Sequence, residues 1–365
     1  MYVYFALALI VPGLYWVFRK NEKRNDLVLL ITCGSMFVLL CLRNPFGFYD
    51  LPTYAVFLDS TKDVTFIEML KGTRFIHTHS IVGLESGYCW FNWILSHLGA
   101  NIYILLCVHA AFVSASLFFF IRKFSLSPAF SLFFYLCIGG LTDHTYILRQ
   151  SFAFAILLFA VTFVIDRKPV KFLLLVLLAA WFHRTALSFL LIYPVSYVKL
   201  TRKTALIGIG LSLSMLAVIP LISSSVIPWV FRLFGKEYYL TISEIDFKEM
   251  LVVLTGMLLF VVFITDFSKE VSITDSTVFW LSDISLLFMA VSVYIGLIAR
   301  IGMSMYLPFA MIMLPNFIER NENKALMDKY RIAICVALFA YLVFIVVTTP
   351  YWFSFVWEPA TLILD

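Results

Sequence analysis

Six ionisable residues stand at the ends of long apolar runs, where they could act on a substrate at the surface of a membrane. They are Arg43, Asp50, Glu85, Arg149, His183 and Arg300. A guanidinium group can bind the oxygens of a phosphate through two parallel hydrogen bonds, and a carboxylate or an imidazole can accept a proton. The set therefore combines a candidate anion site with candidate proton acceptors.

The first three candidates occur in polar stretches that also contain tyrosines. Arg43 and Asp50 belong to a turn-rich stretch that runs to Tyr54, and the stretch from Glu85 to Tyr88 brings a second carboxylate and a second tyrosine. Each charge also has a plainer interpretation. Arg43 could anchor the membrane edge, Asp50 could cap a helix, and Glu85 could pair with a helix dipole.

The other three candidates lie directly at the ends of apolar runs. Arg149 and Gln150 begin one such run, and a helix N-terminus beside a guanidinium group is a ready site for an anion. His183 follows the end of another run, and Arg300 stands between two more. The alternatives here are a packed histidine and a snorkelling arginine.

The elements that position these residues must lie in a bilayer. Hydrophobic residues make up 62% of the 365 residues and charged residues only 13%, so too little polar surface exists to cover a soluble globule. A span needs roughly 20 apolar residues, which leaves room for about a dozen spans and no separate soluble catalytic domain. We expect one integral membrane domain over residues 1–365, an all-α polytopic bundle whose span ends and loops carry the chemistry.

The apolar runs predict twelve transmembrane helices and one shorter helix. The predicted spans are 2–18, 26–42, 101–121, 128–142, 150–166, 169–182, 185–199, 204–222, 249–265, 278–299, 302–319 and 331–348. The aromatic run 85–100 is short for a span, so we expect an interfacial or re-entrant helix in the outer leaflet, with Tyr88, Trp90 and Trp93 at the headgroups. The alternative is that 85–100 spans the bilayer and a neighbouring segment does not.

Clusters of lysine and arginine predict the orientation. They fall in alternate connections, at 19–24, 122–123, 167–171, 199–203, 269 and 320–331. Because cytoplasmic loops carry the excess of Lys and Arg, these connections are expected inside, and both termini and the loops 43–100 and 223–248 outside. All six candidates then face the outer side, which favours one outer polar site over six unrelated roles.

Signs of other chemistry are weak. The six cysteines lie mostly within apolar runs and have no CxxC spacing, which predicts neither a disulfide framework nor a zinc site. Glu244 and Asp246 could hold a divalent cation on a phosphate, although Lys248 and Glu249 beside them fit a solvated turn equally well. The sequence has no Walker loop, dinucleotide fingerprint or protease motif.

Four short patterns, taken together and in order, resemble the EpsG family, which is similar in kind to the Wzy-type polysaccharide polymerases of bacterial envelopes. The patterns comprise Arg43, Gly47, Asp50 and Tyr54; Glu85, Gly87 and Tyr88; Arg149 and Gln150; and Ala180, Phe182, His183, Thr185, Ala186 and Leu187. The resemblance covers roughly residues 40–195, and beyond them only the hydropathy and Arg300 agree. The stretch between Tyr54 and Glu85 is longer than the family pattern.

The resemblance implies a polyprenol-dependent glycosyltransferase in the bacterial plasma (inner) membrane, with its active site facing the periplasm or exterior. It would join oligosaccharide repeats carried on undecaprenyl pyrophosphate into surface polysaccharide, such as capsule, exopolysaccharide or O-antigen. Histidine has the ordinary pKa nearest neutrality, so His183 is the first choice of general base, with Asp50 and Glu85 behind it. The expected substrate-binding residues are Arg43, Tyr54, Tyr88, Arg149, Gln150 and Arg300.

With several arginines to neutralise the pyrophosphate, the resemblance implies neither a metal nor a cofactor. The expected partners are the lipid-linked donor and acceptor and the bilayer, with no nucleic acid, and a chain-length regulator is left open. Two other functions also stay open. A transporter (flippase) of lipid-linked oligosaccharides would carry charges along a passage through both leaflets, whereas only Asp283 is expected inside a span. A membrane O-acyltransferase of surface sugars would receive its acyl donor from the cytoplasm, opposite the expected side of His183.

Overall fold

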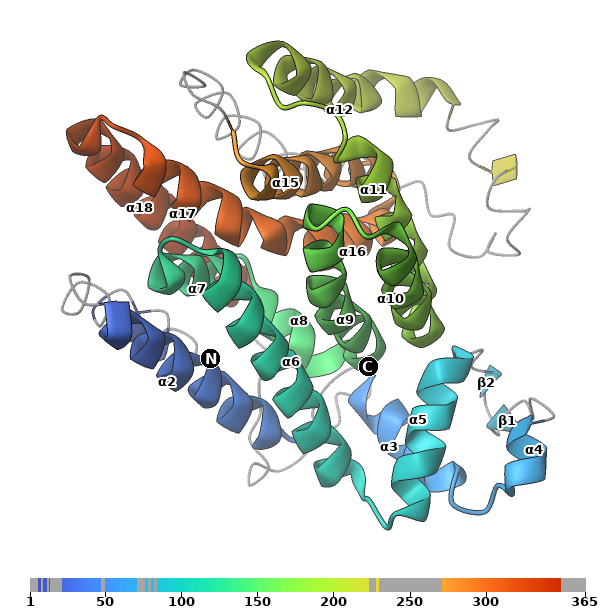
Figure 1. The fold of residues 1–365 in the computed structure, drawn as a ribbon. Coiled ribbons are helices and arrows are strands. Elements are labelled where there is room, and N and C mark those ends of the chain that lie inside the picture. The colour runs from blue at the N-terminus through green and yellow to red at the C-terminus, as the bar shows by residue number, and fades with distance from the viewer. Residues whose placement is uncertain are drawn as a thin grey trace. The chain divides into compact units, whose positions relative to one another are not determined.

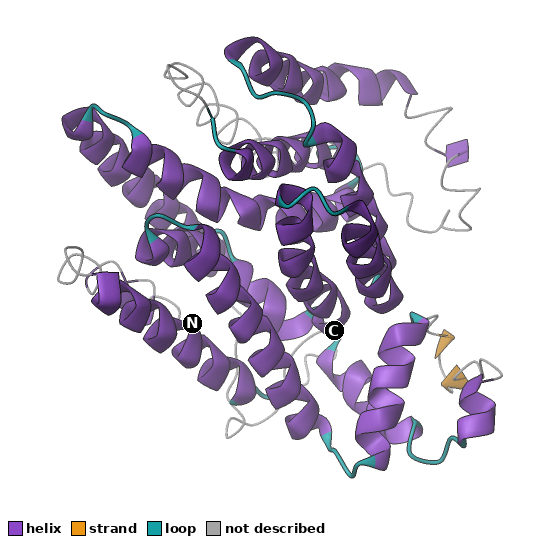
Figure 2. Ribbon diagram, in the orientation of Figure 1, coloured by secondary structure: helices purple, strands orange, loops and turns teal. Residues whose placement is uncertain are grey.

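The protein is almost entirely helical where its structure is described. The computed structural model describes residues 6–7, 9–11, 13, 22–46, 50–70, 76–77, 80–81, 84–222, 228–229 and 271–348. Within these residues the strands are β1 (Ile76–His77) and β2 (Ser80–Ile81), a short antiparallel pair (Figure 2). The predicted all-α class is confirmed.

The helices, which are labelled in Figure 1, cluster into two compact units. The first unit comprises residues 1–163, 170–187 and 332–365, and the second comprises residues 164–169 and 188–331. Helices mainly in the first unit are α2 (Glu22–Cys41), α3 (Leu51–Ser60), α4 (Phe66–Leu70), α5 (Ser86–His97), α6 (Ile102–Phe124), α7 (Pro128–Cys137), α8 (Gly140–Tyr146), α9 (Leu148–Ile165), α10 (Pro169–Phe182) and α18 (Lys324–Thr348).

The second unit combines long α-helices with short irregular ones. Its elements are the 3-10 helix η1 (Arg184–Leu191, shared with the first unit), α11 (Ile192–Val195), α12 (Arg202–Ile222), α15 (Ile273–Ser292), η3 (Gly296–Ile298), α16 (Ala299–Ile301), the π-helix η4 (Gly302–Tyr306), η5 (Leu307–Phe309) and α17 (Ala310–Arg320). Helix α12 packs on α15 at Gly208, where an added Cβ would lie 2.5 Å from Oδ2 of Asp283. Asp283 is therefore a buried carboxyl inside a candidate span, as expected.

Five helical segments among the described residues are long and apolar enough to cross a membrane. They are Ile102–Phe124, Leu148–Ile165, Arg202–Ile222, Ile273–Ser292 and Ala299–Arg320, and shorter apolar helices occupy Asn25–Cys41, Pro128–Cys137, Pro169–Phe182 and Arg184–Val195. Predicted span 249–265 and most of 2–18 lie outside the described residues. The helices establish a membrane protein, and the count of about twelve spans stays a prediction.

Several predicted spans differ from the helices found. Predicted span 278–299 extends past α15, which ends at Ser292, and predicted span 302–319 consists of η4, η5 and α17. Predicted span 128–142 is interrupted, because α7 ends at Cys137 and Gly139 adopts a left-handed φ of +85° before α8 begins. Predicted span 185–199 is instead the 3-10 helix η1 followed by the single turn of α11. Helix α5 matches the shorter helix expected over 85–100, since its 12 residues extend only about 18 Å, against about 30 Å of hydrocarbon.

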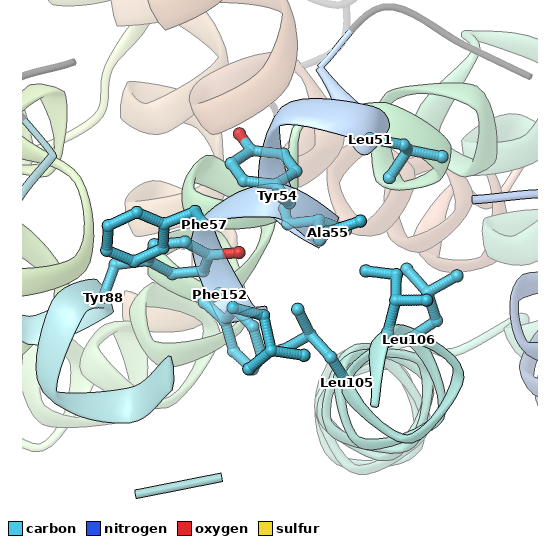
Figure 3. Close-up of a cluster of buried hydrophobic side chains, with 11 residues drawn as sticks. Leu51, Tyr54, Ala55, Phe57, Tyr88, Leu105, Leu106 and Phe152 are labelled. Carbon is cyan, nitrogen blue, oxygen red and sulfur yellow. The ribbon is translucent and has the colours of Figure 1, made fainter. Parts of the chain in front are cut away.

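One hydrophobic core cluster of the first unit joins α3, α5, α6 and α9. Its buried side chains are Leu51, Tyr54, Ala55, Phe57, Leu58, Tyr88, Ile102, Leu105, Leu106, Leu148 and Phe152, most of which are labelled in Figure 3. Phe91 of α5 packs edge-on against Phe152 of α9, with ring centroids 4.8 Å apart. This apolar packing fixes the starts of α5 and α9 relative to each other, and both starts carry candidate residues.

Candidate functional site

The carboxylate of Glu85 stands at the centre of the candidate site. Glu85 is the N-cap residue of α5, and its side chain is 10% exposed. Its Oε2 accepts a hydrogen bond of 2.6 Å from Nη1 of Arg149, and its Oε1 lies 3.2 Å from Nδ1 of His183. The backbone N–H of Arg184 also donates to Oε1, at 3.3 Å. One side chain thus joins the start of α5, the start of α9 and the junction between α10 and η1.

A break in the helix places His183 in the site. Helix α10 ends at Phe182, and the backbone N–H of His183 still donates to the carbonyl of Ala179, at 2.9 Å, before the tighter 3-10 helix begins. The His183 side chain is 20% exposed. The ring nitrogen that faces Glu85 is Nδ1, which is buried and lies 3.2 Å from Oε1 without the geometry of a hydrogen bond.

Arg149 projects from the first turn of α9. Besides its bond to Glu85, its Nε donates a long hydrogen bond of 3.5 Å to the hydroxyl of Tyr54, and its side chain is 22% exposed. Tyr54 is buried and packs edge-on against Tyr88, with ring centroids 5.4 Å apart. The guanidinium group retains further N–H donors and lies beside a helix N-terminus, an arrangement that suits an anion.

The surroundings of Glu85 keep it ionised. Burial alone would raise the pKa of this carboxyl, but its contact with His183 and the charge of Arg149 outweigh burial and lower the pKa to about 2. Glu85 therefore holds no proton at neutral pH and is too weak a base to remove one from a sugar hydroxyl. A carboxylate on one ring nitrogen of a histidine instead orients the ring and stabilises its protonated form. Burial also raises the pKa of Tyr54, which stays a neutral phenol.

The other predicted site residues lie in different settings. Asp50 is exposed and precedes α3 without a side-chain capping bond. Tyr88 and Gln150 are buried, at 0% and 4% exposure. Arg300 is exposed in α16, within the second unit. The structure thus brings Tyr54, Glu85, Arg149 and His183 together, and the other predicted site roles stay predictions.

Arg43 lies in the interior, in a polar cluster that the sequence analysis missed. It is 2% exposed; its Nη1 donates to the carbonyl of His144 at 2.5 Å and its Nη2 donates to Nδ1 of His109 at 3.2 Å. The ring of His144 contacts the hydroxyl of Tyr135 through Nε2 and lies 2.7 Å from Oγ of Ser151 through Nδ1. The available sequence signal was a histidine inside an apolar run, which by itself is most often a packed residue.

No group of three or more His, Cys, Asp or Glu side chains that could hold a metal ion occurs among the residues that the structure describes. Glu244 and Asp246, the pair with cation-binding potential, lie outside those residues. The metal-independence of the site therefore stays a prediction.

Gly87→Ala is expected to displace α5 from α10. An added Cβ would lie 2.6 Å from the backbone oxygen of Trp181, so the first turn of α5 would have to move and carry Glu85 away from His183. Such overpacking costs typically about 1–3 kcal/mol. We expect a lower thermal-unfolding midpoint in detergent and reduced activity. Gly34→Ala in α2 is the matched control, since its Cβ would meet nothing within 4 Å. Equal unfolding midpoints and equal activities of the two variants would contradict the close contact between Gly87 and Trp181.

Acid is expected to destabilise the protein in two steps. Burial and the charge of Arg43 lower the pKa of His144 from 6.5 to about 3. The unfolded chain therefore takes up this proton first, and stability falls as the pH drops below 6.5. The pKa of Glu85 falls from 4.5 to about 2, so its ion pair contributes fully above pH 4.5 and is lost towards pH 2. The thermal-unfolding midpoint, measured at pH values from about 7 to about 3, should fall in both steps. The first step should be smaller in His144→Gln. A midpoint that does not change with pH above 4.5 would contradict the burial of His144.

A family model described as the EpsG family matches residues 26–357 of the chain. The match includes Tyr54, Glu85, Arg149 and His183. No curated protein and no solved structure matches the chain.

Proposed function

Because the chain belongs to the EpsG family of polysaccharide polymerase-like membrane proteins, we propose that it is a glycosyltransferase that polymerises a surface polysaccharide. The proposed substrates are oligosaccharide repeats linked to undecaprenyl pyrophosphate, and the proposed site of reaction is the outer face of the bacterial plasma membrane. The orientation rests on the distribution of Lys and Arg, which predicts that the starts of α5 and α9 lie outside.

The observation that carries the proposal is the position of Glu85 between Arg149 and His183. Its two oxygens contact a guanidinium group on one side, at 2.6 Å, and an imidazole on the other, at 3.2 Å. In the proposed reaction the imidazole accepts the proton and the guanidinium group binds the anion, and both contact the one carboxylate of Glu85. Transfer of a sugar from a pyrophosphate donor requires both groups at the same place.

In the proposed reaction each of the four residues of the site has one role. The acceptor hydroxyl attacks the anomeric carbon of the donor, and its proton passes to Nε2 of His183. The bond between the anomeric carbon and the pyrophosphate oxygen breaks, and Arg149 stabilises the negative charge on the departing lipid pyrophosphate. Glu85 orients the His183 ring and stabilises its protonated form. Tyr54, through its bond to Nε of Arg149, holds the guanidinium plane.

The test is reconstitution. The full-length protein, purified in detergent, is incubated with synthetic undecaprenyl-pyrophosphate-linked repeats, and the products are separated by size. Growth of polymer with release of undecaprenyl pyrophosphate supports the proposal, and persistence of single repeats overturns it. Deletion in cells separates the alternatives: loss of a polymerase leaves single repeats on lipid at the outer face, loss of a transporter leaves them inside, and loss of an acyltransferase leaves full-length unmodified polymer.

Polymerisation is expected to proceed in excess EDTA. In the proposed site Arg149 supplies the positive charge that a divalent cation supplies in many phosphate-transfer enzymes. The measurement is the initial rate before and after chelation. A loss that magnesium or manganese restores would contradict this scheme and direct attention to Glu244 and Asp246.

A further inference from the structure

A buried polar cluster lies within the first unit, separate from the contacts of Glu85. Arg43 follows α2 and contacts two elements through one guanidinium group. It donates to the ring of His109, in α6, and to the backbone carbonyl of His144, in α8. Since Nδ1 of His109 accepts this hydrogen bond, that ring is neutral and Arg43 is the cation of this pair. The fork of an arginine can serve two acceptors on different helices, whereas the compact ammonium group of a lysine cannot reproduce that geometry.

The second member of the cluster connects three consecutive helices. His144 is 3% exposed in α8; its ring contacts the hydroxyl of Tyr135, in α7, and Oγ of Ser151, in α9. Ser151 in turn donates to the carbonyl of Ile147, at 2.9 Å. The cluster therefore links α8 to the first turn of α9, which begins at Leu148.

Arg149 lies within that same turn, two residues before Ser151. We propose that Arg43 is a positioning residue for the transfer reaction, which acts through His144 and Ser151 to fix the first turn of α9 and so aims Arg149 at the pyrophosphate. The proposal rests on the proposed function, and it replaces direct substrate contact by Arg43 with a role in the interior. Two observations carry it: the 2% exposure of Arg43 and the unbroken series of contacts from Arg43 to the residues flanking Arg149.

The kinetic test compares a charged and an uncharged member of the cluster. Arg43→Lys and Ser151→Ala are assayed with lipid-linked repeats, with rates expressed per correctly folded molecule. Small misplacement of a reacting group costs about 10- to 100-fold in rate, so both variants should lose turnover to this extent. Because both act through Arg149, adding either change to Arg149→Lys should cost less than the product of the separate losses. Arg122→Lys is the matched control, since Arg122 is exposed and paired with Asp26.

Other roles for Arg43 give different results. If Arg43 bound the pyrophosphate directly, Arg43→Lys would raise KM for the donor and Ser151→Ala would leave the kinetics unchanged, which would overturn the proposal. If Arg43 served only folding, its variants would yield less folded protein with wild-type turnover per molecule, and that result would overturn it too. Action through Arg149 would also be excluded if the fold-loss of turnover in Arg43→Lys or Ser151→Ala multiplied in full with the fold-loss of Arg149→Lys in the double variants.

A second readout does not depend on activity. Amide hydrogen exchange of residues 144–151 is measured by mass spectrometry in the wild type and in Arg43→Lys. The proposal expects faster exchange in this segment and unchanged exchange in α12, because the opening is local. Unchanged exchange at 144–151 would overturn it. If the wild-type protein does not polymerise repeats, the proposed function fails, and the exchange measurement still decides whether Arg43 fixes the start of α9.

Discussion

His183→Ala is expected to slow polymerisation by about 10²–10⁴-fold while leaving donor binding largely intact, which is the usual contribution of a positioned general base. The reason lies in the geometry around Nδ1, which faces the ionised Glu85 at 3.2 Å and leaves Nε2 to take the acceptor proton. The measurement is the single-turnover rate with the protein in excess of the donor, together with donor affinity.

His97→Ala is the matched control for this change, since His97 is an exposed histidine in the last turn of α5. Both variants must first be shown to insert and accumulate as the wild type does. If His183→Ala turns over at the wild-type rate, the base assignment fails. The role would then pass to Asp50, because the low pKa of Glu85 makes that carboxylate the poorer acceptor.

Arg149→Lys is expected to reduce turnover by about 10²–10³-fold, the range found when one preorganised charge-stabilising donor is removed from an active site. Lysine keeps the positive charge, but it cannot contact Glu85, Tyr54 and a phosphate oxygen within one plane. A silent Arg149→Lys would remove the main support for a pyrophosphate site at the start of α9.

Arg149 could also act indirectly, by holding Glu85 against His183. Glu85→Gln separates the two effects, because it releases the His183 ring while leaving the guanidinium charge in place. The double variant combines Glu85→Gln with Arg149→Lys. If it is no slower than Glu85→Gln alone, Arg149 serves only to position the carboxylate. If the double variant is slower, Arg149 also acts on the leaving group.

The long apolar helices could be predicted from the sequence, whereas their interruptions could not. Spans 101–121 and 150–166 correspond to α6 and α9 because an apolar run of that length has few alternatives to a helix in a bilayer. The break after Cys137 depends on a left-handed Gly139, and glycine in an apolar run is equally compatible with a continuous helix. The 3-10 geometry of η1 has no periodicity that would distinguish it from an α-helix over so short a length.

Tyr54, Glu85, Arg149 and His183 could be named as candidates from the sequence, but their contacts with one another could not be predicted. Glu85 meets Arg149 across 64 positions of the chain, and no local pattern encodes a pairing at such a separation. Arg43 shows the limit more clearly. A cation at the end of an apolar run suggests a residue at the membrane surface, yet its acceptors on His109 and His144 stand 66 and 101 positions away and draw it into the interior.

The carboxylate of Glu85 is shared by Arg149 and His183. Arg149 holds Oε2 of this carboxylate at 2.6 Å, and Nδ1 of His183 lies 3.2 Å from Oε1. In the proposed reaction the ring becomes a full cation beside Oε1 when it takes the acceptor proton, and it then competes with Arg149 for the negative charge of Glu85. Under this proposal the interaction of Glu85 with the guanidinium group would weaken as the pyrophosphate gains charge. Proton uptake and capture of the leaving group would then be coupled through one side chain, and Glu85→Gln would uncouple them.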